Sequence, residues 1–292
     1  MPDRTDIVYR YDGSFEGLMC CVFESYACKE LPAAILSPVC VQETLFPAKE
    51  IITDPARTQR VVAAIPQRMG SAVLPFIRLA FLTCLNDKEH YILLFLRTGF
   101  RVGAQVMSML TDDTVDVLTK AVRYLEREAH MFREFVRFSE HGGVLISEIE
   151  PNNIVLPLIL QHFCERLPEE RFLIRDITHG MALAYEPYRP AIFPIESLEL
   201  PDPNQEELAM RALWQLFYDT VEVEGRHNPK CRMGHMPKRY WKHLTEFNRP
   251  LRTACEKQEY PTPHTAGKVL LPDGTVPAYY PKTSLLRSEA RS

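Results

Sequence analysis

The apolar residues near the start of the chain predict a short strand and then a series of helices. Residues 7–11 are β-branched and aromatic, which is typical of a strand. Residues 15–26 place apolar side chains three and four positions apart, the spacing of an amphipathic helix, and Ser14 can cap it. The same reasoning predicts a short strand within residues 44–52, a helix starting at Asp54–Pro55, and buried helices at residues 71–85 and 89–98.

The period of the pattern changes in the middle of the chain. Residues 115–132 have one apolar and one charged face, as a helix requires, but residues 134–139 and 144–150 alternate around a turn at 141–143. This is the clearest hairpin of the sequence. A helix at 153–167, strands at 171–176 and 181–186, a proline-rich connector at 187–203 and a helix at 205–220 follow. The order β-β-α-β-β favours a mainly antiparallel sheet.

We therefore expect an α+β fold. Its parts would be a helical N-terminal region, a small antiparallel β-β-α-β-β sheet covered by a helix, and a basic helical C-terminal segment. The predicted boundaries are 1–110 for the strand–helix and buried helical region, 111–255 for the sheet with the basic segment, and 256–292 for a loosely ordered tail.

Composition fits a globular protein, with 46% hydrophobic and 25% charged residues among 292. The sequence has no apolar run of the roughly 18 residues that a membrane span needs. No apolar stretch follows a basic start, as it would in a secretory signal. We expect a cytoplasmic protein that does not associate with membranes.

The eight cysteines show no C-x-x-C spacing. Cys20 and Cys21 are adjacent and point in different directions in a helix or a strand, so reduced thiols are favoured over a cluster. His227, Cys231 and His235 lie four positions apart, but two prolines and a glycine nearby argue against the helix that would align them. We expect no zinc, no iron–sulfur cluster and no cofactor.

Charge is distributed unevenly along the chain. The 34 lysines and arginines and 38 acids give a net charge of −4. Residues 226–252 hold eight of those bases and one acid, a local net charge of +7, which leaves −11 for the remainder. A basic block in an otherwise acidic chain is typical of a protein with an anionic partner, most often nucleic acid.

Basic and aromatic side chains alternate within this block, as in surfaces that contact both phosphates and bases. The candidate nucleic-acid contacts are Arg232, Lys238, Arg239, Tyr240 and Lys242. The alternative is a solvated basic helix whose aromatic residues pack on the core. For Trp241 we expect this packing role, with Lys238 and Lys242 facing solvent from the opposite side of a helix.

A second group of candidates is His130, Arg133 and Arg137, which would converge where a helix meets a strand. The alternative is a salt-bridged helix surface, because Glu126 and Glu134 are close enough along the helix to neutralise them. The sequence has no phosphate-binding glycine loop and no recognised nucleophile or metalloprotease motif.

Four segments together resemble a bacterial family of DNA-metabolism proteins built on a domain of unknown function. They are YRYDGSFEGLMCCVFE at 9–24, HMFREFVRF at 130–138, residues 171–182, and MPKRYWKHL at 236–244. The resemblance extends over about residues 6–247. It implies a DNA-linked role, because such domains are fused to uracil-DNA glycosylase-like proteins in some bacteria. Stand-alone members are encoded beside a radical-SAM protein linked to DNA repair. No catalytic residue is implied.

The leading hypothesis is a DNA-binding accessory protein of DNA metabolism or repair that acts with a radical-SAM partner. One alternative is an enzyme acting on a nucleobase or nucleotide, with His130 and the arginines in its site. Another is a protein adaptor that docks on an acidic partner through the basic block.

Overall fold

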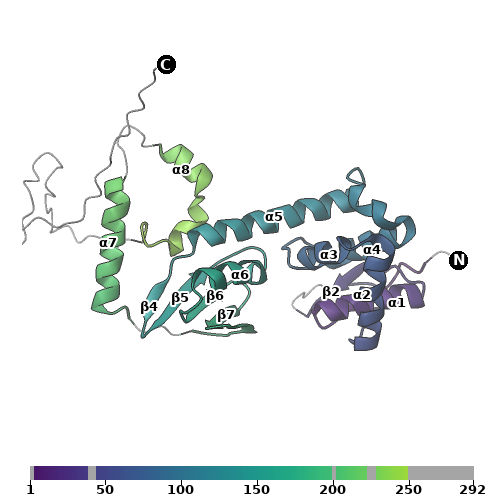
Figure 1. The fold of residues 1–292 in the computed structure, drawn as a ribbon. Helices are drawn as coiled ribbons and strands as arrows, with labels where there is room; N and C mark the ends of the chain where they lie inside the picture. The colour runs from purple at the N-terminus through teal and green to yellow at the C-terminus, as the bar shows by residue number, and fades with distance from the viewer. Residues whose placement is uncertain (1–2, 39–43, 199–201, 222–227, 249–292) are drawn as a thin grey trace, which may run out of the picture. The chain divides into compact units, whose positions relative to one another are not determined.

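The computed structural model describes residues 3–38, 44–198, 202–221 and 228–248, and these residues form an α+β fold with two sheets (Figure 1). The predicted tail at 256–292 lies outside the described residues. Arg226, His227, Arg249 and Arg252, which belong to the candidate segments above, also lie outside them.

The N-terminal region combines a small sheet with four helices. Strands β1 (Val8–Arg10), β2 (Ala34–Leu36) and β3 (Ala48–Glu50) form a parallel sheet of order β2-β1-β3. The helices are α1 (Phe15–Ala27), α2 (Pro55–Met69), α3 (Val73–Phe81) and α4 (Lys88–Val102), and a 3-10 helix, η1 (Gly103–Ser108), follows. Both predicted caps are confirmed. Ser14 accepts a hydrogen bond from Gly17 N at 2.9 Å, and Asp54 accepts one from Ala56 N at 2.8 Å.

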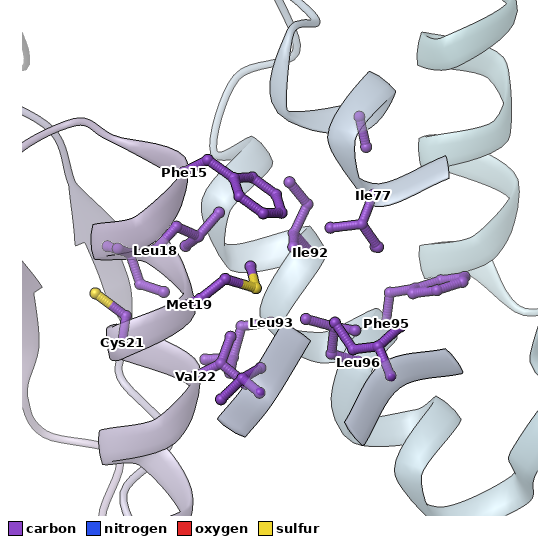
Figure 2. Packing of buried hydrophobic residues seen from close by; sticks show 14 of the residues in the cluster. Phe15, Leu18, Met19, Cys21, Val22, Ile77, Ile92, Leu93, Phe95 and Leu96 are labelled. Atoms are coloured by element: carbon purple, nitrogen blue, oxygen red, sulfur yellow. The ribbon is translucent and has the colours of Figure 1, made fainter. Parts of the chain in front are cut away.

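The apolar stripe of α1 faces α4 in the first hydrophobic core. Leu18, Met19 and Val22 of α1 are buried and point toward Ile92 and Leu93 of α4 (Figure 2). The spacing of these α1 residues is the helical period read from the sequence. Cys20 and Cys21 are also fully buried, as small apolar side chains often are.

Helix α5 (Asp113–Phe135) contributes to both hydrophobic cores. Its first half packs in the N-terminal core, and Leu125, Ala129 and Phe132 pack in a second core. The prediction of a strand from residue 134 is wrong, because the helical spacing of buried residues continues to the end of α5. The first hairpin strand is therefore only β4 (Ser139–His141). The turn at 142–143 is confirmed.

The second sheet has the order β4-β5-β6-β7-β8 and is mixed, which corrects the predicted antiparallel β-β-α-β-β arrangement. Helix α6 returns the chain from β5 to β6, so these two strands pair in parallel. The remaining pairs are antiparallel. The elements are β5 (Val144–Ile149), α6 (Leu156–Arg166), β6 (Phe172–Asp176), β7 (Met181–Glu186) and β8 (Arg189–Pro194).

Strand β8 was not predicted, because its prolines mark a connector in the sequence. Pro190 and Pro194 lie on β8, the edge strand of the sheet, where a missing backbone N–H on the solvent side removes no hydrogen bond between strands. The C-terminal elements are α7 (Gln205–Val221), α8 (Pro229–His235) and the 3-10 helix η3 (Lys238–His243). Helix α8 contradicts the expectation that prolines prevent a helix here. Pro229 is its first residue, a position that needs no donor. None of the described helices is long and apolar enough to cross a membrane.

Candidate nucleic-acid interface

Tyr240 and Leu244 fix the basic segment to the second core. Tyr240 is 4% exposed, and its ring lies 5.1 Å from that of Phe132 and 5.3 Å from that of Phe135. Leu244, one turn further, is fully buried. The sequence placed Tyr240 among the nucleic-acid contacts, but its ring is enclosed by protein and has no free face for a base.

Trp241 packs as predicted. Its ring is half-buried and stacked on Phe247 with centroids 4.3 Å apart, and its Nε1 donates to the carbonyl of Met236 at 3.0 Å. The guanidinium of Arg232 lies 5.5 Å from the Trp241 ring centroid and 5.6 Å from that of Phe247. Arg232 of α8, one of the predicted nucleic-acid contacts, is thus held over the two aromatic rings.

Arg239 is bound by a buried carboxylate of α5. It donates to Glu128 at 3.0 Å and to the Tyr124 hydroxyl at 3.2 Å. Glu128 is 1% exposed and also accepts hydrogen bonds from the backbone N–H groups of Asn152 at 3.0 Å and Asn153 at 2.8 Å. The carboxylate thus joins α5, the loop before α6 and η3, and it offsets most of the charge of Arg239.

The two lysines of η3 differ in their surroundings. Lys242 is 67% exposed and forms an ion pair with Glu150. The hydrogen bond from Lys242 lowers the pKa of Glu150 below its usual range, so the carboxylate is ionised at neutral pH. Lys238 takes part in no ion pair with any described residue, and its Nζ lies 5.8 Å from the Trp241 ring centroid. Both lysines are exposed, as expected, but the predicted opposite faces are wrong, because in the 3-10 helix η3 Lys238 and Trp241, three residues apart, share a side.

The three candidates near the end of α5 have separate partners. His130 is 59% exposed and lies 3.2 Å from Glu134, as in the salt-bridged alternative. Arg133 donates to the carbonyl of Leu158 on α6 at 2.9 Å. Arg137 donates to Glu246 at 3.0 Å. The expected convergence of the three is therefore not found.

The Arg137–Glu246 pair connects α7 to the interface. Glu246 is 1% exposed and also accepts a hydrogen bond from Trp214 Nε1 at 3.0 Å. Arg137 lies 5.5 Å from the Trp214 ring centroid. Nearby, Arg211 of α7 is 2.6 Å from Glu207 and donates to Ser139 of β4. These contacts hold α7 against β4 and the chain that follows η3.

Two hollows flank η3. One, of about 350 Å³, is lined by Arg137, Arg211 and Lys242 together with two histidines, His141 and His243. Burial lowers the pKa of His243, so the ring is neutral at pH 7. The other, of about 290 Å³, is lined by Tyr124, Arg127, His235, Arg239 and Glu128 among others. The predicted residues Arg137 and Lys242 thus meet in the first hollow, and Arg239 and the edge of Tyr240 meet in the second.

The match to a protein-family model covers residues 86–246, more than half of the chain, and the family is described as a domain of unknown function, DUF4130. The chain belongs to the DUF4130 family. No curated protein and no solved structure matches the sequence. The DUF4130 region runs from just before α4 to Glu246, so it includes all the residues named above as lining the two hollows.

The sequence reasoning missed the acids of this DUF4130 interface. Glu128 and Glu246 are buried partners of Arg239 and Arg137, and Trp214 completes the second pair. One signal was available for Glu246, since it is the single acid within a block of eight bases. Among the described residues no group of three or more histidines, cysteines or acids is placed to hold a metal ion.

Proposed function

We propose that this protein is a nucleic-acid-binding accessory protein of DNA metabolism or repair that acts with a radical-SAM partner. The observation that carries the proposal is the presentation of the basic segment. Its described part, residues 228–248, holds five lysines and arginines around η3 and α8, and its single acid, Glu246, is buried. Core packing of Tyr240 and Leu244 holds the backbone of η3 in place, so its cations need not be brought together when a ligand binds.

The exposed cations contribute unequally. Lys242 and Arg239 are offset by Glu150 and Glu128. Lys238 and Arg127 have no ion pair among the described residues, and Arg127 lines the same hollow as Arg239, the chain neighbour of Lys238. A phosphate near either of these side chains would gain most, because it displaces no protein carboxylate. The proposed binding is weak, independent of base sequence, and strongly dependent on salt.

Fluorescence anisotropy with labelled single- and double-stranded oligonucleotides, at two salt concentrations, tests this proposal. We expect the double variant Arg127→Ala/Lys238→Ala to lower affinity and to reduce the salt slope by about 2 for duplex DNA. Lys120→Ala is the matched control, since Lys120 is exposed on α5 and paired with Asp116. The proposal fails if folded parent protein binds no oligonucleotide at low salt, or if Arg127→Ala/Lys238→Ala binds as tightly as the Lys120→Ala control.

The radical-SAM partner is proposed from the resemblance of the four sequence segments. Co-purification of the two proteins, followed by the same oligonucleotide titration on each alone and together, provides the test. We expect a complex that binds DNA more tightly than either protein. A complex that forms without any oligonucleotide binding would favour the adaptor alternative, in which the basic segment docks on an acidic protein.

A further inference from the structure

In the N-terminal region, residues of helices α1, α2 and α4 line an open hollow of about 610 Å³. This volume is within the range of sites that hold small molecules, roughly 300–1,000 Å³. Three aromatic rings line it, from Phe23 and Tyr26 of α1 and Phe100 of α4. Arg60 and Arg68 of α2 stand beside them.

Tyr26 separates this hollow from a second one of about 430 Å³. Tyr26 and Phe100 line both hollows, and Arg97 and Arg101 line the second. The two rings meet edge to face with centroids 5.8 Å apart, and Tyr26 remains 45% exposed. Arg97 lies 5.1 Å from the Tyr26 ring centroid and is fixed by an ion pair with Asp3. Part of the Tyr26 ring is thus open to a ligand.

The charge of this surface is of one sign. Within the part of the chain that the structure describes, no aspartate or glutamate lines either hollow. Arg60, Arg68 and Arg101 have no ion pair among those residues, and Arg60 lies 5.2 Å from the Phe23 ring centroid. Arg60 and Arg68 are eight residues apart on α2, about 12 Å along the helix, with Ala64 between them on the same face.

We propose that this hollow binds a nucleotide unit, with the base against the aromatic rings and the phosphate between Arg60 and Arg68. Such a ligand must be planar, apolar on its faces and anionic at one end. Aromatic rings supply the stacking surface, and guanidinium groups bind phosphate oxygens in pairs. A free nucleotide and an unpaired base of a single strand both present this chemistry. None of the residues that line this hollow lines either hollow beside η3, so the inference is independent of the proposed interface there.

The experiment uses the full chain with Arg127→Ala/Lys238→Ala as background, so that binding at η3 does not mask this site. AMP, CMP, GMP and UMP are titrated by calorimetry, and fluorescein-labelled (dT)8 by anisotropy. Tyr26→Ala should weaken binding at least about fivefold. Arg60→Gln/Arg68→Gln should weaken it about tenfold or more at low salt. Saturable binding of a mononucleotide identifies a free nucleotide as the ligand, whereas binding of (dT)8 alone identifies a strand.

Two controls match these variants. Tyr26→Phe keeps the ring and should bind like the background protein. Arg4→Gln/Lys120→Gln removes the same charge from exposed, ion-paired positions elsewhere and should also bind normally. The inference is overturned if Tyr26→Ala and the double arginine variant bind like their controls. It is equally overturned if inorganic tripolyphosphate displaces (dT)8 as well as unlabelled (dT)8 does, because the site would then recognise charge alone.

Discussion

Replacing Glu128 by alanine should destabilise the protein strongly. The carboxylate is 1% exposed and accepts four hydrogen bonds, from Arg239, from the N–H of Asn152, and from the N–H and Nδ2 of Asn153 at 2.8 and 2.6 Å. Asn153 is itself fully buried and accepts a bond from Cys84 N at 2.8 Å. Removing the carboxylate leaves two buried donors of Asn153 without an acceptor.

Each such donor costs about 1–3 kcal/mol, so Glu128→Ala should lose about 2–6 kcal/mol of the free energy of unfolding. For a domain of this size 1 kcal/mol shifts the midpoint by about 2–4 °C, so the melting temperature should fall by at least about 4 °C. Arg239, which is 38% exposed, can be hydrated and adds little. Glu128→Gln keeps one acceptor oxygen and the volume of the side chain, and it should lose less.

Thermal melts and urea titrations of both variants give these values. Glu126→Ala is the matched control, because Glu126 lies exposed on the same helix, and it should change stability by no more than about 0.5 kcal/mol. If Glu128→Ala melts within about 1 °C of Glu126→Ala, the buried network does not hold α5, the loop before α6 and η3 together.

Three further outcomes are expected. Trp241→Ala should lose less than the roughly 3–5 kcal/mol that removal of a fully buried aromatic side chain costs, since the ring is only half-buried against Phe247. Equal unfolding midpoints of variant and parent in a denaturant titration would contradict the packing role. Burial lowers the pKa of His243 below its ordinary 6.5, so as the pH falls through 6.5 the unfolded chain binds a proton more readily than the folded protein does, and the parent loses stability. Urea titrations at pH 7.5 and 5.5 should therefore show a smaller loss of stability for His243→Gln than for the parent. Burial also raises the pKa of the Cys21 thiol, so iodoacetamide should label exposed Cys28 well before Cys21 in native protein, as mass spectrometry of the peptides would show.

The helices could be predicted from the sequence because their pattern is local. The residues of α5 expected on one face, Val115, Leu118, Val122, Leu125 and Ala129, are all buried. The caps at Ser14 and Asp54 depend on neighbours two or three positions away, and both are found. The pairing of β5 with β6 is different, because it depends on whether α6 returns the chain to the end of the sheet at which β5 begins. The alternation within each strand is the same for a parallel and an antiparallel partner.

In the candidate site, too, local features can be predicted from the sequence and long-range ones cannot. The excess of lysine and arginine in residues 226–252 can be counted, and the packing of Trp241 is anticipated. The α-helical spacing misplaces Lys238, however, because η3 is a 3-10 helix in which residues three apart share a side. The acids that pair with these cations cannot be found by spacing, since Arg137 and Glu246 are 109 positions apart. Such a pair forms only when the whole domain is folded. The sequence therefore indicates where cations are concentrated but does not show which of them remain available to a ligand.

Net charge summed over a segment is a poor measure of the field that a ligand meets. The basic segment has a count of +7, yet Glu128, Glu150 and Glu246 from inside and outside it offset three nearby cations. The remainder of the chain counts −11, which would exclude a second anion site if charge were spread evenly. Helical periodicity instead gathers Arg60 and Arg68 on one face of α2, beside aromatic rings in a hollow that no described acid lines. Because screened charges act over about 10 Å, this local arrangement decides where an anion can bind.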